Sequence, residues 1–152
     1  MPVTGPPSHL DISVGDSAQA IRFYDALLRG LGYRRFRVDM EGFTGEAPAR
    51  ATWGVKMEGG AWFSIEVRPA DPGKLRRYDR YEPGPHHLAF HAESPAKVDA
   101  VHAAMVAAGA EVLDPPEDYS GREGYNDGYY AAFYADPDGV KLEVVYEPTS
   151  NP

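Results

Sequence analysis

The chain of 152 residues contains no cysteine, which excludes a disulfide framework and thiolate chemistry. No apolar run approaches the length of a membrane-spanning helix, and the N-terminal segment 2–7 lacks the charged and apolar regions of a signal peptide. Basic residues are few, 15 against 23 acidic ones, and the formal net charge is -8. Nucleic acid and anionic membranes attract basic surfaces. We therefore expect a cytoplasmic protein that binds neither of them.

What the chain does contain is an internal repeat. His9 opens one strand-like run, and His87 opens a second. Glu66 follows His9 by 57 residues, and Glu143 follows His87 by 56. A repeat of this length indicates two similar structural units. It also supplies two imidazole and two carboxylate donors, which are suitable ligands for one divalent metal ion.

The alternation of side chains predicts which way these four residues point. Residues two apart in a strand share a face of the sheet. In each of the four runs the apolar residues occupy alternate positions, and the candidate ligand lies between them. All four candidates are therefore expected on the face turned away from the apolar packing side. His86 shares a face with the apolar residues of its strand and is the poorer candidate ligand.

Each half also contains one expected helix. In the first half, Asp16 and Ser17 offer an N-cap, an apolar stripe with helical spacing follows, and Gly32 suits the C-terminal cap. In the second half Ser94 can cap, Pro95 fits the first helical position, and Gly109 ends the helix. The expected stripe of this second helix comprises Val98, Val101, Met105 and Val106.

Strand patterns complete an α+β fold of two tandem βαβββ modules. Besides the two runs that begin with histidine, strands are expected at 33–39, 51–57, 61–67, 110–113, 129–134 and 140–146. Pro137-Asp138-Gly139 is typical of the turn that joins the last two strands. We expect one domain, residues 1–152, with modules at about 8–67 and 86–147 and a linker at 68–85.

Three segments interrupt this pattern. Segments 40–50 and 114–128 are long connections of the kind that often form lids or binding loops. The linker 68–85 is rich in cations and tyrosines, namely Lys74, Arg76, Tyr78, Arg77, Arg80 and Tyr81. It either holds an anionic substrate group or forms a solvated linker with a short helical turn.

These features resemble the vicinal oxygen chelate superfamily, in particular its glyoxalase-like branch. The resemblance extends from about Ser8 to Tyr146. It is carried by the doubled βαβββ unit, the histidine that opens a strand, Phe23-Tyr24, and the closing run 136–143, Asp-Pro-Asp-Gly-Val-Lys-Leu-Glu. The superfamily includes glyoxalase I, methylmalonyl-CoA epimerase, extradiol ring-cleaving dioxygenases, fosfomycin-resistance enzymes and bleomycin-binding proteins. The resemblance implies cupped mixed sheets that enclose a small-molecule cavity, with the helices outside.

The same resemblance implies the metal ligands. His9 and His87 fall on the first-strand ligand positions, and Glu66 and Glu143 fall on the last-strand positions. The bound ion would be Zn²⁺, Ni²⁺, Co²⁺, Mn²⁺ or Fe²⁺. Glu66 discriminates between activities, because the ring-cleaving and fosfomycin-resistance members use two histidines and one glutamate. Its alignment with Glu143 requires a two-residue shift relative to the glycines that precede the two strands.

The leading hypothesis is a lyase or isomerase in which Glu143 or Glu66 moves a proton of a chelated, small oxygenated substrate. The run 144–147, Val-Val-Tyr-Glu, departs from the pattern of the glutathione-binding members. One alternative is a metal-free protein that sequesters a drug or metabolite, as bleomycin-binding relatives do. A third possibility is an extradiol dioxygenase. Edge strands and helix faces left over from pairing two modules usually find a partner, so we expect a two-fold symmetric homodimer.

Several other side chains have both a functional and a structural interpretation. Tyr129, Tyr130, Tyr134 and Trp62 either line the cavity or pack in the core. His91 shares a strand face with His87, and it either contacts substrate or lies at the surface. His102 falls in the second expected helix and is expected to face solvent. A single histidine on a strand is usually structural, but two pairs at matching spacing favour a metal site.

Overall fold

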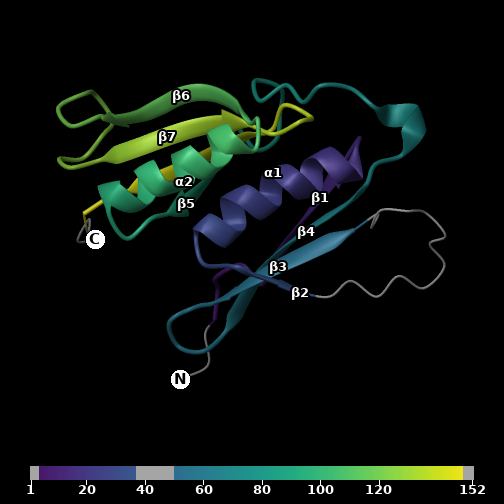
Figure 1. Cartoon of the computed structure of the whole chain (residues 1–152), viewed down its shortest axis with the longest axis horizontal. Coiled ribbons are helices and arrows are strands. Elements are labelled where there is room, and N and C mark those ends of the chain that lie inside the picture. Colours follow the sequence, from purple (N-terminus) through teal and green to yellow (C-terminus); the bar gives the residue numbers. More distant parts are fainter. Residues whose placement is uncertain (1–3, 37–49, 149–152) are drawn as a thin grey trace. The chain divides into compact units, whose positions relative to one another are not determined.

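A computed structural model describes residues 4–36 and 50–148. The chain divides into two compact units, Met1–Leu75 and Arg76–Pro152. The division falls inside the linker expected at 68–85. Within the described residues each unit contains one α-helix and one four-stranded sheet, in the order β-α-β-β-β along the chain (Figure 1). The expectation of an α+β fold built from tandem βαβββ modules is confirmed.

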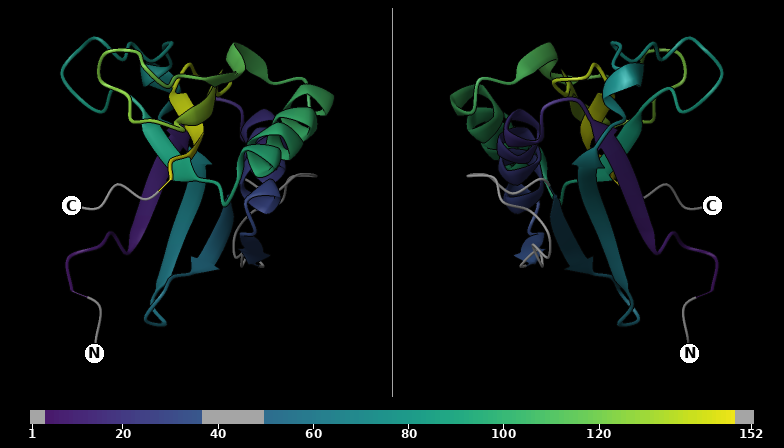
Figure 2. Two further views of the ribbon diagram at one scale, coloured as in Figure 1. Left: turned by 90° about the vertical axis from the view of Figure 1, so that its left-hand side faces the viewer. Right: turned by 90° about the vertical axis from the view of Figure 1, so that its right-hand side faces the viewer.

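The first unit pairs its first strand with its last. Its elements are β1 (His9–Val14), α1 (Ser17–Gly30), β2 (Arg34–Phe36), β3 (Ala51–Lys56) and β4 (Trp62–Pro69). The strand order is β1-β4-β3-β2, in which β1 runs parallel to β4 and the other neighbours are antiparallel. Helix α1 lies along one face of this sheet (Figure 2). The aromatic contact between Tyr24 of α1 and Trp53 of β3 identifies that face.

The second unit repeats the same topology. Its elements are β5 (Leu88–His91), α2 (Pro95–Ala107), β6 (Glu111–Asp118), β7 (Tyr130–Ala135) and β8 (Lys141–Tyr146), with strand order β5-β8-β7-β6. Here β5 is parallel to β8, and the remaining pairs are antiparallel. In both units the helix connects the first strand to the second, and these two strands lie at opposite edges of the sheet. Because the two strands run in the same direction, a crossover joins them and not a tight hairpin.

The helix boundaries follow the expected capping residues. Asp16 Oδ1 accepts a hydrogen bond from the Gln19 amide at 3.0 Å, and Ser94 Oγ accepts one from the Lys97 amide at 3.1 Å. Pro95 begins α2, where the missing amide hydrogen costs nothing. Gly32 has φ +89 just after the end of α1, a conformation that L-residues with side chains rarely adopt.

Some sequence-based boundaries were wrong. Strand β4 continues to Pro69, and β6 continues to Asp118 through part of the segment that was expected to be a loop. Because β6 is an edge strand, its two prolines remove no hydrogen bond from a central ladder. Strand β2 ends at Phe36, and residues 37–39 of the expected strand, like 40–49 of the expected loop, lie outside the described residues.

The burial of two side chains of α2 differs from what the sequence predicts. Val98, Val101 and Met105 are buried, but Val106 is 54% exposed and lies off the packed stripe. His102 is partly buried, and its Nδ1 lies 3.0 Å from the hydroxyl oxygen of Tyr134. Within the described ranges no helix is long and apolar enough to cross a membrane.

Candidate functional site

Each sheet has one face covered by its helix and one face turned away from it, and the candidate ligands lie on the second face. In the first unit His9 pairs with Ser64 across β1 and β4, and Glu66 lies two residues further along β4. In the second unit Leu88 pairs with Leu142, so that continuation of the ladder puts Glu143 two residues beyond the partner of His87. The nearly equal spacing seen in the sequence therefore corresponds to equal strand register.

In the second unit His87 and Glu143 meet directly. Glu143 is only 2% exposed, and its Oε2 lies 3.1 Å from Nε2 of His87. The hydroxyl of Tyr129 donates a hydrogen bond to the other carboxylate oxygen, Oε1. A buried carboxylate without partners is costly, and here both oxygens have one.

The surroundings of this carboxylate are apolar and aromatic. Tyr119, Ala131, Phe133 and Val145 form a buried cluster on the same face of the sheet, and Tyr129 packs against it. Burial, and next the hydrogen bond to Glu143, raise the pKa of Tyr129 above its ordinary value. Tyr129 is therefore a neutral hydrogen-bond donor at neutral pH.

His86 has a role that sequence reasoning missed. Its Nδ1 lies 2.8 Å from Nδ1 of His87, a distance at which one of the two nitrogens donates a hydrogen bond to the other. Burial and the charges of His87, Lys141 and Arg80 lower the pKa of His86. This favours a neutral ring that orients His87. The sequence signal was only its position next to His87, because His86 precedes β5 and strand alternation does not set its direction.

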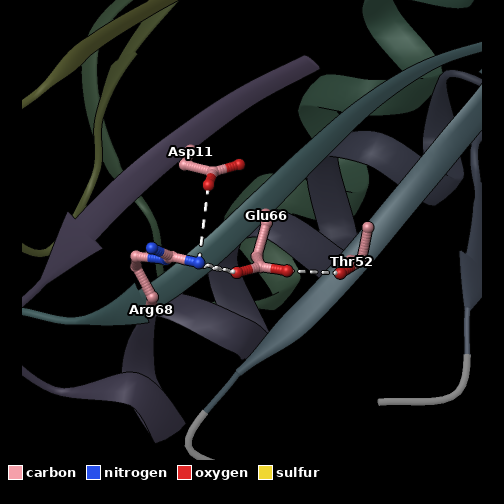
Figure 3. Close-up of polar contacts among 4 residues, drawn as sticks. All are labelled: Asp11, Thr52, Glu66 and Arg68. Atoms are coloured by element: carbon pink, nitrogen blue, oxygen red, sulfur yellow. Dashed lines mark hydrogen bonds and ion pairs between the residues drawn. The ribbon is translucent and has the colours of Figure 1, made fainter. Parts of the chain in front are cut away.

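In the first unit Glu66 makes different contacts (Figure 3). Arg68 donates to Glu66 Oε1 from Nη2 at 2.9 Å and from Nε at 3.2 Å, and the Thr52 hydroxyl donates to Oε2 at 3.1 Å. Partial burial alone would raise the pKa of Glu66. The hydrogen bonds from Arg68 and Thr52, with the positive charge of Arg68, outweigh it and hold the pKa below its usual value. His9 is exposed, and its Nδ1 lies 3.4 Å from Ser8 Oγ.

The donor set can be compared with the needs of a metal ion. In the part of the chain that the structure describes, no group of three or more histidine and carboxylate side chains is arranged around one point. The pair His87 Nε2 and Glu143 Oε2, 3.1 Å apart, does fit. Two ligands bonded at about 2.1 Å to one ion, at tetrahedral or octahedral angles, lie about 3.0–3.4 Å from each other.

The remaining candidate residues lie on different faces of the sheets. Tyr130 donates a hydrogen bond to Asp99 of α2 at 2.8 Å, and Tyr134 contacts His102, so both lie on the helix side, away from Glu143. His91 is exposed on the same strand face as His87. Trp62 is 46% exposed and packs edge-on against Phe36 in the first unit.

The linker has the features of a solvated connecting segment with a short helical turn. It contains a short 3-10 turn, Pro72–Lys74. Arg76 pairs with Glu82 at 3.0 Å and Arg77 with Glu111 at 2.9 Å, while Lys74 lies 3.9 Å from Asp71. Most of its cations are exposed and already have carboxylate partners, as in a solvated connecting segment.

Comparison with known proteins gives this arrangement a family. The model of the Glyoxalase/Bleomycin resistance protein/Dioxygenase superfamily matches residues 7–144. The chain belongs to this superfamily. Its members often bind a metal ion, commonly act on small molecules and commonly form dimers.

Relatives of this superfamily cover nearly the whole chain. YqjT of Bacillus subtilis (strain 168), an uncharacterized protein, is 30% identical over 139 residues, which are 90% of this chain and 95% of YqjT. A crystal structure from Bacillus halodurans, provisionally named a glyoxalase, is 27% identical with a TM-score of 0.67, covering 95% of this chain and 97% of that one. A glyoxalase/dioxygenase from Nostoc punctiforme, 18% identical with a TM-score of 0.64 over 95% and 92% of the two chains, shares the fold.

Proposed function

We propose that the chain is a glyoxalase-type, divalent-metal-dependent lyase or isomerase that acts on a small oxygenated substrate by proton transfer. The observation that carries the proposal is the contact between His87 and the buried Glu143. Imidazole and carboxylate donors suit Zn²⁺, Ni²⁺, Co²⁺, Mn²⁺ and Fe²⁺. The superfamily resemblance also implies His9 and Glu66 as ligands, but Glu66 is already paired with Arg68.

The bound metal would polarise a substrate oxygen and so acidify the adjacent carbon-bound proton. Glu143 would accept that proton through Oε2, the oxygen that faces His87, while Tyr129 keeps Oε1 hydrogen-bonded. Tyr129 fixes the carboxylate, His86 orients His87, and the aromatic cluster excludes water from their side of the sheet. Exclusion of water strengthens each of these electrostatic contacts.

A second candidate, an extradiol dioxygenase, is favoured by the contacts of Glu66. The oxygenase relatives use two histidines and one glutamate, and Glu66 is already paired with Arg68.

A third candidate is a metal-free binding protein. It is favoured by the contact of three tyrosine rings. Tyr125 lies 5.0 Å from Tyr119 and 4.9 Å from Tyr129 between ring centroids, and such aromatic surfaces hold apolar ligands without a metal.

Metal content tests the proposal first. Protein purified without added metal or chelator should contain about one divalent ion per chain by elemental analysis, and His87→Ala should abolish this binding. His91→Ala is the matched control, because it removes an exposed imidazole from the same face of β5. Metal-free wild-type protein that shows no thermal shift with Zn²⁺, Ni²⁺ or Mn²⁺ would favour the binding protein.

The reaction that the protein catalyses distinguishes a lyase or isomerase from a dioxygenase. The loaded protein should exchange a carbon-bound proton next to a carbonyl in an α-hydroxyketone, hemithioacetal or acyl thioester, and Glu143→Gln should slow this exchange by about 10²–10⁴-fold. Consumption of O₂ with a catechol by Fe²⁺-loaded protein, without proton exchange, would instead identify a dioxygenase.

A further inference from the structure

The two units place different residues around their equivalent glutamates. Across the strands, Glu66 pairs with Asp11 of β1 and Thr52 of β3, and Arg68 lies two residues further along β4. Around Glu143 the corresponding positions are apolar, namely Ala89, Phe133 and Val145. One carboxylate thus lies beside a fixed positive charge, and the other does not.

We infer that Arg68 is a built-in cation that occupies Glu66 and keeps it from binding a metal ion. The inference deepens the proposed function and rests on it for the metal at His87 and Glu143. By holding Glu66, Arg68 reduces the number of residues that can bind the metal ion. The same contact excludes Glu66 as the base for proton transfer.

The geometry shows how completely Glu66 is occupied. The guanidinium contributes two hydrogen bonds to Oε1, at 2.9 and 3.2 Å, and Thr52 contributes one to Oε2 (Figure 3). Nη2 of Arg68 also lies 3.5 Å from Oδ2 of Asp11, so that one cation bridges two carboxylates. A metal ion approaching Oε1 of Glu66 would have to displace this guanidinium, and one approaching Oε2 would compete with the Thr52 hydroxyl.

The chemistry of arginine makes that displacement unfavourable. The guanidinium stays charged at every physiological pH, so proton loss cannot release Glu66. Arg68 contacts two carboxylates in the described structure, those of Asp11 and Glu66. If Glu66 bound a metal ion, Arg68 would keep only the contact with Asp11. The lowered pKa of Glu66 agrees with a carboxylate that is already stabilised in its charged form.

The first arm of the test asks whether Glu66 contributes to metal binding in the full-length protein. The dissociation constant for Zn²⁺ is measured by competition with a chromophoric chelator for wild type and Glu66→Gln. We expect a change of less than about threefold, because loss of a real ligand typically costs tenfold or more. A larger loss of affinity would overturn the inference.

The second arm asks whether Arg68 is the residue that keeps Glu66 from binding a metal ion. In the His87→Ala background, Arg68→Gln should produce Zn²⁺ binding that is absent without it, and adding Glu66→Gln should abolish the gain. Arg29→Gln is the matched control, because it removes a different arginine–carboxylate pair of the first unit, with Asp25. Far-UV circular dichroism identifies any variant that fails to fold, and Arg68→Met, which keeps the aliphatic stem without the positive charge, then replaces Arg68→Gln with the same expected gain.

The two proposals fail in distinguishable ways. Wild-type protein that binds no metal contradicts the proposed function, and the second arm still reports on Arg68. Absence of a Glu66-dependent gain on removing Arg68 contradicts the inference alone, whatever His87 binds.

Discussion

Glu143 and Glu66 occupy equivalent positions and differ in everything that surrounds them. Glu143 is buried, with a neutral phenol and an imidazole as partners, whereas Glu66 is held by a guanidinium and a threonine. Repeat spacing and alternation were enough to select both glutamates from the sequence. They could not reveal the difference, because Arg68 and Tyr129 act through side-chain contacts that strand periodicity does not describe.

Tyr129→Phe tests the support of Glu143. Without the hydroxyl donor the buried carboxylate lacks a partner at Oε1, and we expect metal affinity to fall by about tenfold. The unsatisfied oxygen should also destabilise the fold by about 1–3 kcal/mol. The measurements are a Zn²⁺ titration and denaturant unfolding of the metal-free protein.

Tyr130→Phe is the control for that experiment. It deletes the neighbouring hydroxyl, which bonds to Asp99 on the helix side of the sheet. Its metal affinity should match wild type. Equal losses in both variants would show that Tyr129 acts through general packing and not through Glu143.

The ion pair of Glu66 predicts a pH dependence of stability. Because the folded-state pKa of this carboxyl is lowered, its stabilisation is fully present above the unfolded value of about 4.3 and is lost as pH falls through the folded value. Glu66→Gln should therefore lower the Tm of chelator-treated protein at pH 7. The difference from wild type should shrink below about pH 4. A difference that is constant over the whole pH range would rule out this origin.

Helix ends were the most predictable elements, because capping depends on local sequence. Asp16, Ser94 and Pro95 lie at the positions that their chemistry favours. Strand ends were less predictable. The extension of β6 depends on pairing with β7 across two register shifts, a long-range contact that no local pattern encodes.

The N-cap of α1 gives a direct stability test. Asp16→Ala removes the acceptor for the Gln19 amide and should lower the free energy of unfolding by about 1 kcal/mol. Asp16→Asn keeps an oxygen at the same place and should recover most of the loss. Urea denaturation of the three proteins measures both effects, and equal stability of the alanine and asparagine variants would contradict a capping role.

For the molecule as a whole, the repeat predicted two units with one topology, and the structure has them. The repeat could be recognised because a βαβββ module buries its apolar strand face under a single helix, which leaves a periodic signal in the sequence. Strand alternation adds to that signal at Tyr129 and Tyr130. They are neighbours in the chain and lie on opposite faces of the sheet, where their hydroxyls bond to Glu143 and to Asp99 respectively.

Assembly is the last prediction, and it follows from the exposed parts of the first unit. Strand β1 is an edge strand that is mostly exposed, and Leu10 within it is 36% exposed. An uncovered edge with apolar side chains usually finds a partner, and two-fold symmetry is the commonest solution. We therefore expect light scattering at micromolar concentration to give twice the chain mass of 16.6 kDa. Leu10→Lys should shift the protein toward monomer, whereas Leu75→Lys, at an exposed leucine outside the strands, should not. A monomeric wild type would show that these edges need no second chain.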